Sequence, residues 1–153
     1  MKKIDIVDRA LRSFRVGEGA SFVREITGEE IALFASLSGD RNQLHTDESY
    51  AATTPYKKPI AHGLLVAAPI SALAGHLLPG KRCLLLEVRS RFVRPVFPGD
   101  RLTYRGTITR ISPATRVLKV QVEVTNQEGG VVLKGTYDGQ VLADPTDKEN
   151  PRT

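Results

Sequence analysis

The sequence has few cysteine and histidine residues that could form disulfide bonds or bind a metal ion. Among 153 residues there is one cysteine, Cys83, so the chain can form no internal disulfide. A single thiol is typical of proteins from a reducing compartment, and we expect the cytoplasm. Three histidines and one cysteine also offer no recognisable ligand cluster, so we expect no metal site.

Long apolar runs are missing as well. The N-terminus, MKKIDIVDRALRSF, has no hydrophobic stretch long enough for a signal peptide. The most hydrophobic segment, residues 60–78, is about as long as a membrane span, but five residues interrupt it: His62, Pro69, Ser71, Gly75 and His76. The interruptions indicate a buried core helix, so we expect no membrane partner.

Charge is not concentrated anywhere in the chain. There are 22 Lys and Arg against 17 Asp and Glu, a net charge of +5. Proteins that bind nucleic acid usually combine a concentrated basic face with a reading motif, and neither is recognisable here. A plain solvated surface explains the excess best, and a small ligand that carries phosphate groups would fit it as well.

The first half of the chain shows helical and strand periodicities in turn. Apolar residues at positions 4, 7, 11 and 14 predict a short N-terminal helix, and residues 20–26 alternate as a strand does. Thr27 and Glu30 form a capping box for a helix that ends near Gly39. A long helix is predicted from residue 62 or 63 to about 78, with Pro69 kinking or dividing it.

The rest of the chain predicts β-structure. Residues 83–96, 101–112, 115–126 and 131–142 form four strands, and the last three alternate apolar and polar residues as half-buried antiparallel strands do. A long apolar helix must be covered, and a curved antiparallel sheet wrapped around it predicts an α+β fold. We expect a single domain over residues 1–143 and a disordered polar tail, 144–153.

One polar stretch stands just before the most hydrophobic segment: SLSGDRNQLHTDESYA, residues 36–51. It places an acid, Asp40, five residues before an imidazole, His45. Taken alone, Asp40 is explained by loop chemistry after a helix, and His45 by a surface position. Asn42, His62 and Gly63 nearby favour a functional reading of the whole group.

The extended pattern resembles the hydratase motif of the MaoC-like (R)-specific enoyl-CoA hydratases. That motif reads roughly Asp-x-Asn-Pro-x-His, followed by an apolar-flanked His-Gly, and Asp40, Asn42, His45 and His62-Gly63 match it. Gln43 stands where the family usually has proline. The likeness runs from about residue 14 to 142, and RPVFPGD, residues 94–100, resembles a turn of the family. The resemblance implies a hot-dog fold, in which a long helix is wrapped by an antiparallel sheet.

The resemblance also implies an activity and roles for individual residues. The activity is reversible syn addition of water to a trans-2-enoyl-CoA, which gives the (R)-3-hydroxyacyl-CoA without a cofactor. Asp40 would exchange protons and His45 would aim the water. The backbone N–H of Gly63 would bind the oxyanion, and Ser71 matches a serine near the catalytic pair. Asn42 would brace the loop, while His62 fits a helix N-cap or packing role better than a chemical one.

Other functions remain open at this stage. The alternatives are a dehydratase acting on 3-hydroxyacyl thioesters of acyl carrier protein, a thioesterase, and a non-catalytic acyl-CoA-binding subunit. The spacing of Asp40 and His45 argues against the thioesterase, and the presence of both residues argues against the non-catalytic subunit. The resemblance further implies a homodimer or a larger homo-oligomer, which would cover an open sheet edge.

Overall fold

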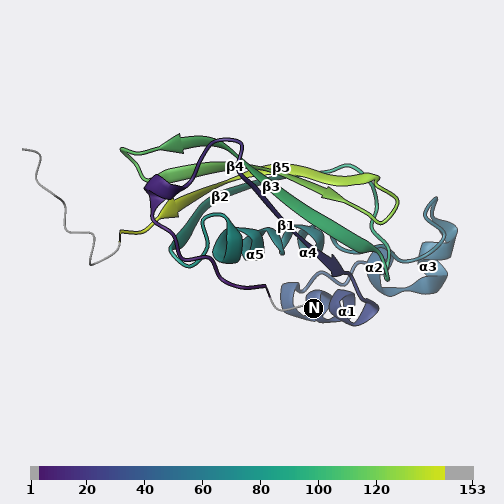
Figure 1. Ribbon diagram of the computed structural model, residues 1–153. Helices are drawn as coiled ribbons and strands as arrows, with labels where there is room; N and C mark the ends of the chain where they lie inside the picture. Colours follow the sequence, from purple (N-terminus) through teal and green to yellow (C-terminus); the bar gives the residue numbers. More distant parts are fainter. Residues whose placement is uncertain (1–3, 144–153) are drawn as a thin grey trace, which may run out of the picture.

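The computed structural model describes residues 4–143, and the predicted disordered tail, 144–153, lies outside the described residues. Five strands form one antiparallel sheet in the order β1-β3-β4-β5-β2, seen as the upper layer in Figure 1. The strands are β1 Gly19–Glu25, β2 Cys83–Phe92, β3 Arg101–Ser112, β4 Val117–Thr125 and β5 Val131–Val141. Because β1 and β2 are the two edges, the sheet is open rather than a closed barrel.

The helices form a second layer and a small cluster. They are α1 Gly28–Ser38, α2 Gln43–Thr46, α3 Glu48–Thr53, α4 Gly63–Ala67, α5 Ile70–Ala72 and the π-helical turn η2 Leu73–Leu77. Figure 1 shows α4 and α5 beneath the sheet and α1, α2 and α3 together at one end. No helix in residues 4–143 is both long enough and apolar enough to cross a membrane.

The core lies between the sheet and the helical segments α4, α5 and η2. Leu73 of η2 and Tyr104 of β3 are fully buried, and the Tyr104 hydroxyl donates to the Val66 carbonyl at 2.8 Å. Gly106 of β3 allows the close approach, since a Cβ there would stand 2.9 Å from the Leu73 side chain. A helix held against one face of a curved antiparallel sheet confirms the predicted α+β hot-dog fold.

The predicted long helix is present but divided, and Pro69 is the reason. A proline has no N–H for the helical ladder, so the regular α4 ends at Ala67 and helical hydrogen bonding resumes after Pro69. The last turn widens, with the Leu78 N–H bonded to the Leu73 carbonyl five residues back. The division was predicted from the sequence, whereas the π-helical turn was not.

The predicted N-terminal helix was wrong. Only a single 3₁₀ turn, η1 Leu11–Ser13, forms there. The segment before it is held by main-chain bonds to distant residues: the Val7 N–H donates to the His76 carbonyl, and the Lys81 N–H donates to the Val7 carbonyl. These tertiary contacts override a helical periodicity that rested on only four apolar residues.

Candidate active site

The loop that carries the acid begins at the end of α1. The predicted capping box starts this helix, since Thr27 and Glu30 each bond the other's main-chain N–H. Gly39 ends it with a φ of 78°, a left-handed conformation that glycine adopts without strain. Asp40 therefore leaves the helix directly into an exposed loop.

Asn42 connects the acid to the histidine. Its N–H donates to the Asp40 carboxylate at 3.1 Å, and its carbonyl accepts from the His45 N–H at 2.9 Å. Its side chain caps α2 by accepting from the Leu44 N–H at 2.9 Å. Gln43 is the first residue of α2, a position where proline is favoured because the N–H has no helical partner. Glutamine can therefore occupy this position with the same helix start.

The tautomer of His45 follows from one hydrogen bond. Its Nδ1 lies 2.7 Å from the Ile60 carbonyl oxygen, and a carbonyl can only accept, so Nδ1 carries the proton. In the neutral ring the lone pair is then on Nε2, which is the nitrogen that can accept a hydrogen bond. Ile60 is itself held to α2, because its N–H donates to the Leu44 carbonyl at 3.3 Å.

His62 lies behind this pair and is only 2% exposed. Its Nε2 is 3.0 Å from the main-chain oxygen of Asp40. Its ring lies against that of His45, with centroids 3.9 Å apart, and near that of Phe34 at 5.1 Å. It occupies the N-cap position of α4, but its side chain makes no capping hydrogen bond.

The fold brings together an acid and two imidazoles that are up to 22 residues apart in sequence. One carboxylate oxygen of Asp40 and one ring nitrogen each of His45 and His62 lie within 4.8 Å of one another. The argument that the histidines offer no ligand cluster was therefore wrong, since such a set of atoms can also bind a divalent cation. The absence of a metal from the reaction stays a prediction.

A pocket of about 310 Å³ opens beside His45. Gly63, the first residue of α4, also lines it, and among residues 4–143 no main-chain acceptor takes its N–H. The Phe92 ring also lines the pocket and packs directly against Gly63, since a Cβ on Gly63 would stand 3.0 Å from that ring. The other lining residues are mostly apolar, with Arg94 as the charged exception: Tyr56, Ile60, Ala61, Val66, Val93, Pro95, Val96 and Val132.

Ser71 lies elsewhere. It is exposed and faces a different hollow, lined also by Arg24, His76 and Lys81. The bend at Pro69 separates it from the pocket that contains His45 and Gly63, so its role in substrate binding stays a prediction. Sequence reasoning missed Tyr56, Phe92 and Val132 as pocket residues, because their place depends on how the end of the sheet meets the α2–α3 segment.

The chain is similar to known proteins over most of its length. The MaoC like domain matches residues 15–130. The chain is 36% identical over 124 residues to an (R)-specific enoyl-CoA hydratase of Aeromonas caviae, which covers 81% of this chain and 92% of the relative. A second (R)-specific enoyl-CoA hydratase, from Rhodospirillum rubrum, is 36% identical over 135 residues, or 88% of this chain and 93% of the relative.

A solved structure leads to the same group of proteins. The unliganded R-hydratase of Pseudomonas aeruginosa superposes with a TM-score of 0.82 at 36% identity, over 88% of this chain and 86% of that one. A family match over most of the chain, together with these identities, shows the class. The protein belongs to the MaoC-like domain family. Three residues of its motif, Asp40, His45 and His62, lie close together in the structure.

Proposed function

We propose that this protein is an (R)-specific enoyl-CoA hydratase, a hydro-lyase that adds water reversibly to trans-2-enoyl-CoA. One observation carries the proposal: an Asp40 carboxylate oxygen and a His45 ring nitrogen lie within 4.8 Å of each other. His45 and Gly63 line one mainly apolar pocket, and within residues 4–143 no main-chain acceptor takes the Gly63 N–H. The named activity of the relatives supports the same reading.

The chemistry assigns a task to each group. A water held between Asp40 and the Nε2 lone pair of His45 loses a proton to the Asp40 carboxylate as its oxygen bonds to C3 of the enoyl group. Electrons move onto the thioester oxygen, where the Gly63 N–H stabilises the negative charge. Collapse of this enolate transfers that proton from Asp40 to C2, on the same face, so one water is added and the Asp40 carboxylate is regenerated.

The pocket suits the acyl part of such a substrate. Its walls are mainly apolar side chains, which would bury the hydrocarbon and exclude bulk water from the thioester. Arg94, the charged residue among the lining groups, is compatible with the phosphates of CoA and with an acidic carrier protein alike. Dehydration of a 3-hydroxyacyl thioester is the same reaction in reverse, and it uses the same groups.

Hydration of crotonyl-CoA tests the proposal. The conjugated double bond absorbs in the ultraviolet, so its hydration lowers the absorbance of the solution. We expect a steady fall that depends on enzyme concentration and stops at an equilibrium mixture. No fall with crotonyl-CoA or with longer trans-2-enoyl-CoA substrates would contradict the proposed function and favour a non-catalytic acyl-CoA-binding subunit.

A homodimer that joins two copies along β2 also fits the fold. β2 is an edge strand, and four of its apolar side chains are 42–53% exposed: Leu84, Leu86, Val88 and Phe92. An apolar edge of this kind is normally covered in a native protein. Phe92 also lines the pocket, which would place the active site next to the interface. Sedimentation should show a dimer or a larger oligomer at micromolar concentration, and a monomer throughout would contradict it.

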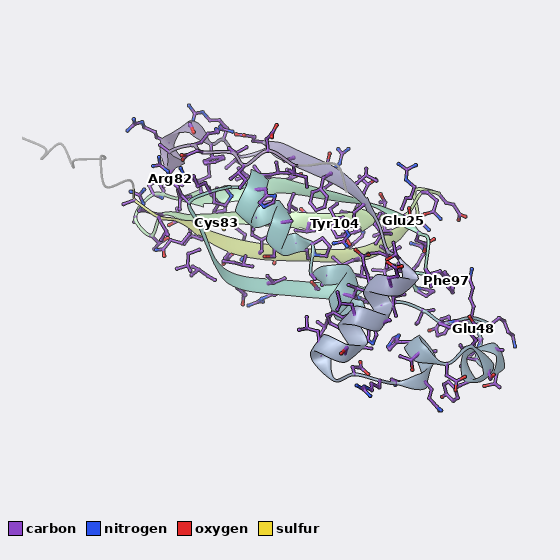
Figure 2. All side chains as sticks on the ribbon, turned by 90° about the horizontal axis from the view of Figure 1, so that it is seen from below. Glu25, Glu48, Arg82, Cys83, Phe97 and Tyr104 are labelled. Atoms are coloured by element: carbon purple, nitrogen blue, oxygen red, sulfur yellow. The ribbon has the colours of Figure 1, made fainter. Side chains whose placement is uncertain are left out.

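A cytoplasmic location fits the state of Cys83. Burial raises the pKa of this thiol to about 11, so it stays protonated at neutral pH. Figure 2 shows Cys83 at the opposite end of the molecule from Glu48 of α3, far from the proposed site. A thiol in this state is a packing residue rather than a disulfide partner. Fractionation of cells that finds the protein only outside the cytoplasm would contradict this placement.

A further inference from the structure

His62 contacts both proposed catalytic residues and precedes the third group. Its Nε2–H donates to the Asp40 carbonyl at 3.0 Å, and the protonation is fixed because a carbonyl can only accept. Its ring lies against the His45 ring at 3.9 Å. It also directly precedes Gly63, which lines the pocket. The His62 side chain, at the start of α4, therefore contacts both Asp40 and His45.

Capping and packing do not account for an imidazole at this position. The side chain makes no hydrogen bond to α4, so it is not an N-cap in the chemical sense. In the neutral ring with Nε2 protonated, Nδ1 is an acceptor, and it is buried with no hydrogen-bond partner in the described structure. A buried unpaired nitrogen is unfavourable, and a purely apolar ring would avoid it. The distinctive contribution of histidine here is the N–H that holds Asp40.

The Asp40 loop needs such an anchor. Asp40 is exposed, and its other hydrogen bonds are local: its N–H donates to the Ser38 hydroxyl oxygen, and its carboxylate accepts from the Asn42 N–H. The bond from His62 ties the loop to the helix that carries Gly63, 22 residues further along the chain. A misplacement of about 1 Å at a reacting group can lower a rate about a hundredfold, so an anchor between the acid and the oxyanion donor matters for chemistry.

We propose that His62 is a positioning residue: its Nε2–H fixes the Asp40 main chain, and its ring fixes the plane of His45. The inference rests on the proposed hydratase function and adds to it. His62 does not exchange protons with the substrate. It keeps Asp40, His45 and the Gly63 N–H at fixed positions relative to one another. Its removal therefore lowers kcat with little effect on substrate binding.

Two substitutions that differ by one methylene group test the donor. Glutamine at position 62 can place an N–H₂ near the place of Nε2, whereas asparagine is too short to reach the Asp40 carbonyl. We expect His62→Asn to lower kcat for crotonyl-CoA by about 10- to 100-fold with KM within about threefold of wild type. His62→Gln should recover a large part of that loss. His76→Asn, the same change at a half-buried histidine outside the pocket, is the matched control.

A double-mutant cycle with Asp40 separates positioning from general stability. If His62 acts through Asp40, then His62→Asn should have little further effect in an Asp40→Asn background. An equal fractional loss in both backgrounds would overturn the proposal. So would a His62→Asn enzyme with kcat within about twofold of wild type, or a loss that His76→Asn reproduces.

A measurement on the unmodified protein covers the case in which the variants do not fold. Imidazole ¹⁵N–¹H spectra should show His62 protonated at Nε2 and His45 at Nδ1. A His62 ring protonated only at Nδ1 would overturn the proposal, because no N–H would then face Asp40. This readout needs no catalytic activity, so it distinguishes failure of the His62 inference from failure of the hydratase function, which the crotonyl-CoA assay reports.

Discussion

Asp40→Asn and His45→Gln should each lower turnover of crotonyl-CoA by about 10²–10⁴-fold, the range for a positioned acid–base group. Asparagine keeps the size of Asp40 but cannot take the proton of the attacking water. Glutamine at position 45 loses the Nε2 lone pair that the bond to Ile60 leaves free. Because both residues act on one water, the double variant should be little slower than the slower single variant.

Asp47→Asn is the matched control for this prediction. Asp47 lies in the same segment, and its carboxylate caps α3 by accepting from the Tyr50 N–H at 2.9 Å. Asparagine caps a helix about as well as aspartate, so this variant should keep nearly full activity. Circular dichroism should show that all the variants are folded. An Asp40→Asn enzyme that retains more than about a third of wild-type turnover would exclude Asp40 as the proton-transfer group.

Gly63→Pro should lower turnover by about 10²–10³-fold, the effect of losing one oxyanion donor. Proline removes the N–H that the proposal assigns to the thioester oxygen. The local structure accepts a proline: Gly63 is the first residue of α4, and His62 has φ −59° and ψ 135°, the extended region that a residue before proline prefers. The Phe92 ring, 3.0 Å from an added Cβ, would have to move slightly.

Gly28→Pro controls for the general effect of replacing glycine by proline at the first residue of a helix. Gly28 is likewise the first residue of a helix, α1, and follows an extended residue, Thr27. It has open space where a Cβ would be added, so Gly28→Pro should fold and stay active. The Gly63→Pro enzyme should still bind an acyl-CoA within about tenfold of wild type, since the N–H that it has lost is proposed to stabilise mainly the transition state. A folded Gly63→Pro enzyme with near-normal turnover would show that the donor lies elsewhere.

Local signals in the sequence predicted those parts of the fold that local interactions determine. The Thr27–Glu30 capping box and the stop at Gly39 are both present, because each depends on residues within one helical turn. Pro69 divides the core helix as its missing N–H requires. Alternation of apolar and polar residues also predicted four of the five antiparallel strands, β1, β3, β4 and β5, since one face of each must be buried.

The features that the sequence missed depend on contacts between distant segments. Residues 4–10 form no helix, because Val7 bonds main-chain groups of His76 and Lys81, which no local pattern reveals. The bond from His62 to the Asp40 carbonyl spans 22 residues, so the sequence could show that His62 stands before Gly63 but not what it touches. The place of Ser71, outside the pocket, likewise follows from the path of the helix after Pro69.

The stereochemistry of the product tests the central claim most directly, since the proposed mechanism delivers the water from Asp40 and His45 to one face of the double bond only. The hydration product of crotonyl-CoA would be offered separately to (R)-specific and (S)-specific 3-hydroxyacyl-CoA dehydrogenases, with NADH formation as the readout. The account predicts NADH with the (R)-specific enzyme and almost none with the (S)-specific one. Strong NADH formation with the (S)-specific enzyme would contradict it, whatever the rate of hydration.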